Sequence, residues 1–279
     1  MTTHSPDLVP TDASDRLRVT FGRVVVSEWR KMVTLRSTWW TLSIMVALHA
    51  GIGLLMAVYT RINGSNLTPE EATDWAVGPT QMTQLAIVVL AVMTITSEYA
   101  TGQIRVSATA VPSRLPILTA KALVLGCVTL VAGVLGVALS VGASMVVGGG
   151  TVAFTLSGTE TARLLAATPL YLVGIALVSL GVGALIRSTG GTIATMMGLL
   201  LVVEQILMAI PFHLTKLIAP WLPSNAGSLI RYDLDFLETV KEVVAPGAYL
   251  GPWGGFAVLL GWAVLFGVLA GVRLRSRDV

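Results

Sequence analysis

The sequence predicts an all-α integral membrane protein with six transmembrane helices. Only 12% of its 279 residues are charged, 54% are hydrophobic, and the mean hydropathy is +0.80. Soluble proteins contain about 25% charged residues. The shortage of charge is concentrated in blocks of around twenty residues, which is the length of a helix that crosses a bilayer.

The N-terminal region is predicted to lie outside the membrane. Residues 1–15 are polar and hold no apolar run that could act as a signal peptide, so we expect a disordered cytoplasmic tail. Over residues 16–37, apolar residues recur at helical spacing with basic and polar residues between them. This pattern predicts an amphipathic helix in the headgroup region; a soluble helix packed on a partner is the alternative.

The transmembrane domain is predicted to cover residues 38–279. Trp39, Trp40 and Tyr59 border the first span, as interfacial aromatic residues do. Arg187 to Gly191 predict a tight turn between the fourth and fifth spans. The predicted spans cover about residues 38–59, 79–96, 117–147, 162–186, 192–212 and 252–272.

Small residues inside the spans are predicted to take part in helix packing. Cys127 lies in an apolar run and is expected to be a small core residue, and a single cysteine provides no disulfide framework. Glycines in the third and fourth spans are expected to let neighbouring helices approach closely. These are Gly126, Gly133, Gly136, Gly142, Gly174, Gly181 and Gly183.

The even number of spans places both ends of the chain on the same side of the membrane. Most of the 18 lysines and arginines fall in the terminal segments and in the loops on that side. The positive-inside rule assigns this side to the cytoplasm. Both termini are therefore predicted to be cytoplasmic.

The segment 211–251, between the last two spans, is predicted to form an external cap. Leu217, Ile218 and Trp221 are too apolar for free solvent and too few to span, so we expect them to enter the outer leaflet or pack on helix ends. Residues 229–244 have helical spacing. The pattern predicts two short helices.

Several kinds of chemistry are not expected. A phosphate-binding loop needs Gly-Lys followed by Ser or Thr, which the sequence does not contain, so ATP hydrolysis is not expected in this chain. The spans show no metalloprotease spacing and no nucleophile with a base. The net charge of +3 comes from residues scattered at the ends of apolar runs. We therefore expect no enzyme activity, no bound cofactor or metal, and no nucleic-acid partner.

Three polar residues inside the spans are candidates for a substrate or proton path. Glu204 lies roughly 18 Å along the fifth span, where a charge is costly unless it is protonated, paired or hydrated. Gln205 follows it, and His49 lies near the middle of the first span. The alternative is structural: hydrogen bonds from Glu204 or Gln205 to a neighbouring helix, and a packing role for His49.

A polar segment, residues 97–121, separates the second and third spans. It contains Glu98, Arg105, Arg114 and Lys121, and its two prolines stop one helix before another begins. This pattern suits a short helix on the cytoplasmic face that contacts a soluble partner. An ordinary basic loop obeying the positive-inside rule is the alternative.

This segment resembles the coupling segment of ABC-2 type transporter permeases. The resemblance rests on Glu98 to Arg105 (Glu-Tyr-Ala-Thr-Gly-Gln-Ile-Arg), followed by Pro112, Arg114 and Lys121. It extends to the basic N-terminal helix, the six spans and the apolar insertion with residues 222–227, Leu-Pro-Ser-Asn-Ala-Gly. The chain is most similar to small actinobacterial permeases encoded apart from their ATPase.

The resemblance implies a subunit of an exporter in the bacterial cell membrane. Two permeases, identical or different, would pair, and each would rest on a separate ATP-binding subunit that carries ATP and magnesium. The apolar sides of the first, second and fifth spans would meet the substrate, an amphiphile, drug, peptide or glycan. The partner-coupling residues would be Glu98, Tyr99, Gly102, Arg105 and Arg114.

Two other functions stay open. One is an ion-driven secondary transporter with Glu204 as the proton-carrying group, which would need internal repeats with broken helices at matching positions. The other is a non-transporting assembly or immunity factor that holds a partner at the membrane. Dependence on ATP hydrolysis by a separate subunit distinguishes the exporter from both.

Overall fold

The computed structural model describes residues 20–64, 75–102, 115–148, 159–210, 212–244 and 248–276. The regular structure in these residues is helical, and six helices are long and apolar enough to cross a membrane. These helices indicate a multi-pass membrane protein. The tail predicted for residues 1–15 and the coupling residues Arg105 and Arg114 lie outside the described residues.

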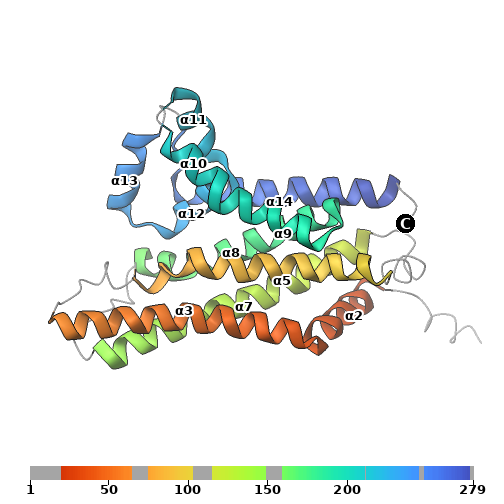
Figure 1. Ribbon diagram of the computed structural model, residues 1–279, viewed down its shortest axis with the longest axis horizontal. Coiled ribbons are helices and arrows are strands. Elements are labelled where there is room, and N and C mark those ends of the chain that lie inside the picture. Colours follow the sequence, from red (N-terminus) through yellow and green to blue (C-terminus); the bar gives the residue numbers. More distant parts are fainter. Residues whose placement is uncertain are drawn as a thin grey trace, which may run out of the picture.

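The six spans lie roughly parallel to the long axis of the molecule (Figure 1). Their limits agree with the sequence prediction to within a few residues, and most extend further because a helix continues beyond its apolar run. The bounds are Arg36–Asn63 (α3), Thr80–Ala100 (α5), Leu115–Gly148 (α7), Thr159–Ile186 (α8), Thr189–Ala209 (α9, η1 and α10) and Gly251–Ser276 (α14).

The fifth span is interrupted by a wider turn. It begins as α9 (Thr189–Met197), continues as the π-helix η1 (Gly198–Val203) and ends as α10 (Glu204–Ala209). The predicted turn from Arg187 to Gly191 is shorter in the structure, because Ser188 caps α9 and accepts a hydrogen bond from the Gly191 nitrogen at 3.3 Å. Only Arg187, with a φ of 63°, has a left-handed backbone there.

α8 is the central helix of the bundle. It packs against α5, α7 and α14, and 72% of its most apolar stretch is buried, compared with 22% for α3 and for the fifth span. α3 lies on the outside, against α7 and α5. The mostly exposed sides of α3 and the fifth span are therefore the surfaces that this chain leaves for lipid or for another protein.

Glycines allow close packing at most of the predicted positions. A Cβ on Gly133 would lie 2.9 Å from the Cα of Pro169 in α8, and a Cβ on Gly181 would lie 2.7 Å from the Cβ of Phe266 in α14. Gly136, Gly174 and Gly183 are similarly close to neighbours. The prediction is wrong for Gly142, where an added Cβ would have no described atom within 4 Å, and a Cβ on Gly126 would make only an ordinary contact.

Cys127 is exposed on the surface of α7, so its predicted place in the core is wrong. The apolar residues around it in the sequence suggested burial. In a bilayer, however, the lipid-facing surface of a helix is as apolar as the protein core. Apolar neighbours therefore cannot distinguish the two positions.

The N-terminal helix α2 spans Phe21–Thr34, so the described part is shorter than the predicted 16–37. It ends because Leu35 has an extended backbone, after which α3 begins at Arg36. The buried residues Val24, Glu28 and Met32 recur every four positions, and Val24 packs on Ile117 and Ala120 of α7.

The segment before α14 contains more elements than predicted. Three short α-helices occur, α11 (His213–Ile218), α12 (Pro223–Ser228) and α13 (Leu234–Val243), with the 3₁₀ turns η2 (Ala219–Trp221) and η3 (Leu229–Arg231). The predicted helix 229–244 is divided because Asp233 caps α13 by accepting a hydrogen bond from the Phe236 nitrogen at 2.6 Å.

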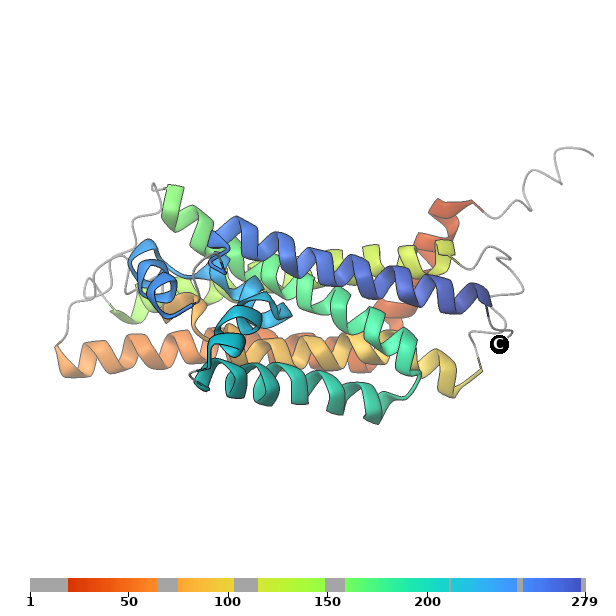
Figure 2. The ribbon, with the colours of Figure 1, turned by 90° about the horizontal axis from the view of Figure 1, so that it is seen from above.

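The two ends of the bundle differ in what they carry. α2, the end of α5 and the start of α7 lie at one end, here called the α2 end (Figures 1 and 2). α11, α12 and α13 gather toward the other end, here called the α13 end (Figures 1 and 2). α12 packs against α14 and α8, so this part of the chain is inserted against the spans.

Candidate functional site

Four charged side chains meet inside the protein at the α2 end and form what we call the ionic cluster: Glu28, Lys31, Glu98 and Lys121. The Lys31 ammonium lies 2.7 Å from Glu28 Oε1 and 2.9 Å from Glu98 Oε1. The Lys121 ammonium lies 2.5 Å from Glu28 Oε2 and 2.7 Å from Glu98 Oε1. Each lysine therefore bridges both carboxylates.

The ionic cluster joins three helices. Glu28 and Lys31 lie one turn apart on α2, Glu98 lies near the end of α5, and Lys121 lies in the second turn of α7. The side chain of Lys121 is only 2% exposed, and both carboxylates are buried. Buried charges are tolerated when they are paired, and two acids with two lysines balance. The cluster therefore holds the three helices in one arrangement.

Lys31 is the most exposed member of the ionic cluster. Burial lowers the pKa of its ammonium group, but hydrogen bonds from it to Glu28 and Glu98, and their negative charges, act in the opposite direction and prevail. The pKa of Lys31 is therefore raised above its ordinary value. This lysine stays charged at neutral pH and keeps both carboxylates neutralised.

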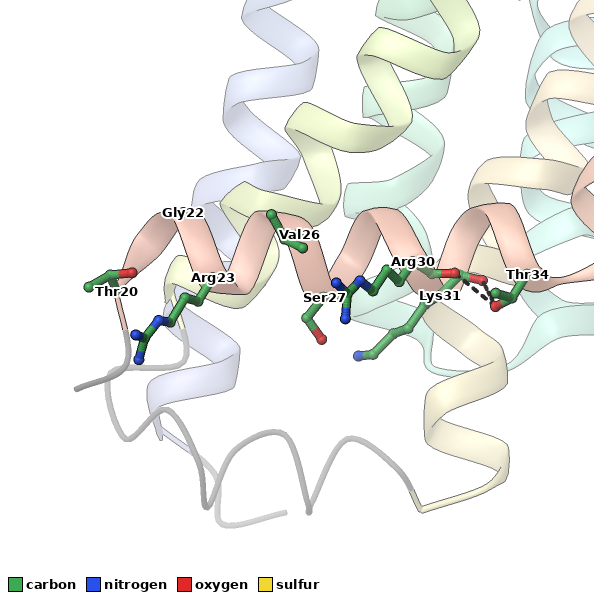
Figure 3. A pocket seen from close by; sticks show the side chains of 8 residues that line it. All are labelled: Thr20, Gly22, Arg23, Val26, Ser27, Arg30, Lys31 and Thr34. Carbon is green, nitrogen blue, oxygen red and sulfur yellow. Dashed lines mark hydrogen bonds between the residues drawn. The ribbon is translucent and has the colours of Figure 1, made fainter. Parts of the chain in front are cut away.

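Two hollows lie on either side of Lys31. One, of about 420 Å³, lies between α2, α3 and α5 and is lined by the cluster and by hydroxyl groups such as those of Thr38, Thr94 and Ser97. The other, of about 790 Å³, runs along the outer face of α2 (Figure 3). Arg23, Ser27 and Lys31 extend from the same side of that helix (Figure 3). Lys31 thus connects the buried cluster with an exposed basic surface.

The predicted coupling residues within the described chain have different environments. Glu98 bonds to lysines of its own chain and is buried. Tyr99 donates a hydrogen bond to the Ala184 carbonyl oxygen at 3.4 Å, and the Arg187 guanidinium lies 5.2 Å from its ring centre. Gly102, with a φ of 70°, takes the left-handed conformation just after α5 ends.

Sequence reasoning missed two members of the cluster, Glu28 and Lys31. Their spacing of three residues on one helix was a signal of an ion pair. Nothing in the local sequence indicated that Glu28 faces inward, because acidic residues usually lie on the polar side of an amphipathic helix. Its buried partner Lys121 is 93 residues away.

Glu204 connects the fifth span to α12. Its side chain is fully buried, and its two carboxylate oxygens accept hydrogen bonds from the backbone nitrogens of Ser224 at 3.1 Å and Asn225 at 2.8 Å. The π-helical turn η1 immediately precedes it and changes which side of the span the following residues face. Gln205 is exposed and lines two cavities near α12.

His49 is also fully buried, and its hydrogen bond is to a different part of the chain from those of Glu204. Its Nε2 lies 2.9 Å from the Ala76 carbonyl oxygen, at the start of the second span. Gly136 of α7 packs against it. Its Nδ1 has no hydrogen-bond partner within the described part of the chain.

A second group of polar residues near α12 was not predicted. The Tyr171 hydroxyl donates a hydrogen bond to Gln84 Oε1 at 2.5 Å and lies 2.8 Å from Ser224 Oγ, so it connects α8, α5 and α12. The Arg231 guanidinium lies 4.8 Å from the Tyr171 ring centre. Sequence reasoning placed Arg231 only in the external segment, because a buried arginine cannot be recognised from its neighbours in the chain.

Neither metal chemistry nor a known family is indicated. In the described ranges, no group of three or more His, Cys, Asp or Glu side chains could hold a metal ion. No family model matches the chain, and no curated protein is found to be similar to it. The candidate functional residues thus form two separate groups: the ionic cluster at the α2 end, and the polar residues around α12 toward the α13 end.

Proposed function

We propose that the chain is the membrane-spanning permease subunit of an ATP-binding-cassette exporter of the ABC-2 type, driven by a separate ATPase subunit. The observation that carries the proposal is the ionic cluster. It joins α2 to the end of α5 and the start of α7, and its residues Glu98 and Lys121 belong to the segment 97–121 that resembles a coupling segment. A push on this end would therefore move three helices together.

In this proposal the α2 end faces the cytoplasm and receives the ATPase. Arg23 and Arg30 give the outer face of α2 exposed positive charge, which suits charge-assisted contacts with carboxylates of a partner. Arg105 and Arg114 would contact the partner directly. Glu98 would act as a positioning residue, because its carboxylate is buried and bonded to Lys31 and Lys121.

The proposal also includes a second permease, either another copy or a different subunit. The exposed sides of α3 and of the fifth span support this part, because they are the least buried of the spanning helices. Substrate would pass between the two permeases. Its class, an amphiphile, drug, peptide or glycan, comes from the resemblance alone.

The experiment that tests coupling uses Arg105→Glu, a change outside the ionic cluster. The chain is expressed in its native host, purified in mild detergent, and assayed for a bound ATPase and for vanadate-sensitive ATP hydrolysis. Arg105→Glu should insert normally but lose the ATPase, because a positive contact becomes a repulsive one. The matched control is Lys241→Glu, an exposed lysine on α13. Equal ATPase recovery with Arg105→Glu and with the wild type would refute this coupling role.

A further inference from the structure

Arg231 is a buried cation that pairs with no acidic side chain among the described residues. It ends η3 and is only 5% exposed. Its guanidinium carbon lies 4.8 Å from the ring centre of Tyr171 and 5.8 Å from that of Tyr232. It makes no hydrogen bond or ion pair with another described residue, and its Nε is buried without an acceptor. A buried charge is expensive unless an opposite charge compensates it.

Three other basic residues at the α13 end have hydrogen-bond or ion-pair partners within the described chain. Arg163 donates hydrogen bonds to the Ile230 and Tyr232 carbonyl oxygens, at 2.8 and 3.0 Å, and to Glu160 at 3.0 Å. Arg61 donates to the Val147 carbonyl oxygen at 3.0 Å. Lys241 pairs with Glu238 on the surface.

A cavity of about 590 Å³ lies beside Arg231 and is lined by groups that can donate hydrogen bonds. They include Ser224, Asn225, Ser228, Gln81 and Gln205. The nearby carboxylates are occupied by backbone groups: Asp233 caps α13, and Glu204 accepts from the Ser224 and Asn225 nitrogens. The wall also contains Asp233, whose carboxylate accepts from the Phe236 nitrogen and is not paired with Arg231. Arg231 and the neutral donors of the same wall are the groups that bind an oxyanion.

A second cavity, of about 180 Å³, adjoins the first. The two share Gln205, Asn225, Ser228, Tyr232 and Phe236 in their walls. Beyond the shared part, the wall of the second cavity is largely apolar and includes Met208, Leu229, Val240 and Val244. A polar cavity that contains Arg231 and continues into an apolar one matches a molecule with an anionic head and an apolar tail.

We propose that these two cavities bind an anionic amphiphile, with its phosphate or carboxylate group on Arg231 and its apolar part against α13. The guanidinium offers two parallel N–H groups to a pair of oxygens, and the rings of Tyr171 and Tyr232 hold its plane. The serine, asparagine and glutamine side chains of the cavity wall would donate further hydrogen bonds to the anionic group. This site goes beyond the proposed function and does not require ATP-driven transport.

The test measures equilibrium binding to the purified full chain in dodecyl maltoside micelles. The probes are radiolabelled dodecyl phosphate, inorganic phosphate and phosphatidylglycerol. Dodecyl phosphate should bind saturably and more tightly than inorganic phosphate, because only the former fills the apolar cavity. Competition by phosphatidylglycerol would identify a membrane lipid as a source of the ligand, and its absence would point to a non-lipid amphiphile.

Arg231→Gln should weaken dodecyl phosphate binding by about tenfold or more, the effect of losing one charge-assisted contact. The matched control, Lys241→Gln, removes one exposed cation from the same end and should bind like the wild type. Arg231→Lys keeps the positive charge but lacks the two parallel N–H groups of the guanidinium, so it should bind dodecyl phosphate with intermediate affinity. This variant also tests the proposal if Arg231→Gln does not fold. Wild-type protein that binds no dodecyl phosphate, equal affinity for both phosphates, or unimpaired Arg231→Gln would each overturn the proposal.

Discussion

At the scale of single residues, Lys121 is the most buried charge in the α2 end, and it neutralises carboxylates from two other helices. Lys121→Met would leave Glu28 and Glu98 with Lys31 alone. Breaking a buried ionic group by removing one partner costs about 3–5 kcal/mol. We expect the free energy of unfolding in detergent to fall by this amount, measured by chemical denaturation.

A double variant tests whether the loss of stability in Lys121→Met comes from the ionic cluster. Glu28→Gln combined with Lys121→Met leaves Lys31 and Glu98 as a neutral pair, so the double variant should lose less than the sum of the single variants. Lys241→Gln, in an exposed pair, should change the free energy by roughly 0–1 kcal/mol. Additive losses in the double variant would contradict the account.

The raised pKa of Lys31 predicts how the cluster responds to alkali. A folded-state pKa above the ordinary value of 10.5 means that the stabilisation is fully present below that pH and is lost as the pH rises through the folded-state pKa. The difference in unfolding free energy between the wild type and Lys31→Gln should therefore stay constant from about pH 7 to about pH 10 and shrink as the pH rises above 10.5. A difference that grows with pH would be inconsistent with this assignment.

The residues that sequence reasoning found and missed differ in a physical way. Glu98 and Lys121 were noticed because they are charged and flank apolar runs. Lys31 was seen only as one of many basic residues, and its partner Glu98 is 67 residues away in the chain. Such pairing depends on how the helices pack, which local spacing does not reveal.

At the scale of elements, Glu204 fastens α12 to the fifth span through the Ser224 and Asn225 nitrogens. Glu204→Gln keeps a single acceptor oxygen and replaces the other with a donor. We expect one of the two amides to exchange roughly tenfold faster, measured by hydrogen exchange on peptides covering residues 219–231. Gln205→Ala, at the adjacent exposed position, should leave the exchange unchanged. Unchanged exchange in Glu204→Gln would show that the hydrogen bonds from Ser224 and Asn225 to Glu204 do not hold α12 in place.

The contact between α8 and α14 depends on the absence of a side chain at Gly181. A Cβ there would lie 2.9 Å from the backbone carbonyl carbon of Phe266, so Gly181→Ala should destabilise the protein by about 1–3 kcal/mol. Gly142→Ala, which faces open space, should be neutral or stabilise by up to about 1 kcal/mol through helix propensity. Thermal unfolding in detergent distinguishes the two, and equal effects would contradict the packing.

The elements themselves were largely predictable, because each span is an apolar run bounded by polar residues. The π-helical turn in the fifth span was not, since Gly198 to Val203 has the composition of an ordinary helix. The docking of α12 was also missed. This helix is short and mixed in polarity, and its position depends on hydrogen bonds to Glu204 and on packing against α14.

At the scale of the whole molecule, the two ends carry different chemistry. The α2 end combines a balanced ionic cluster with an exposed basic face, whereas the α13 end carries a buried arginine, paired with no described carboxylate, beside a cavity. Sequence reasoning identified the multi-pass architecture from composition and from apolar runs of about twenty residues. It could not tell which apolar faces turn inward, as Cys127 illustrates, because lipid and protein core select the same residues.

The measurement that tests the central claim most directly is purification of the chain from its native host in mild detergent, followed by mass spectrometry and an ATPase assay. We predict recovery of an ATP-binding subunit with vanadate-sensitive hydrolysis that is lost in Glu98→Ala, because that change disrupts the ionic cluster. A chain that purifies without any ATPase would contradict the exporter and leave the ion-driven carrier or the assembly factor in its place.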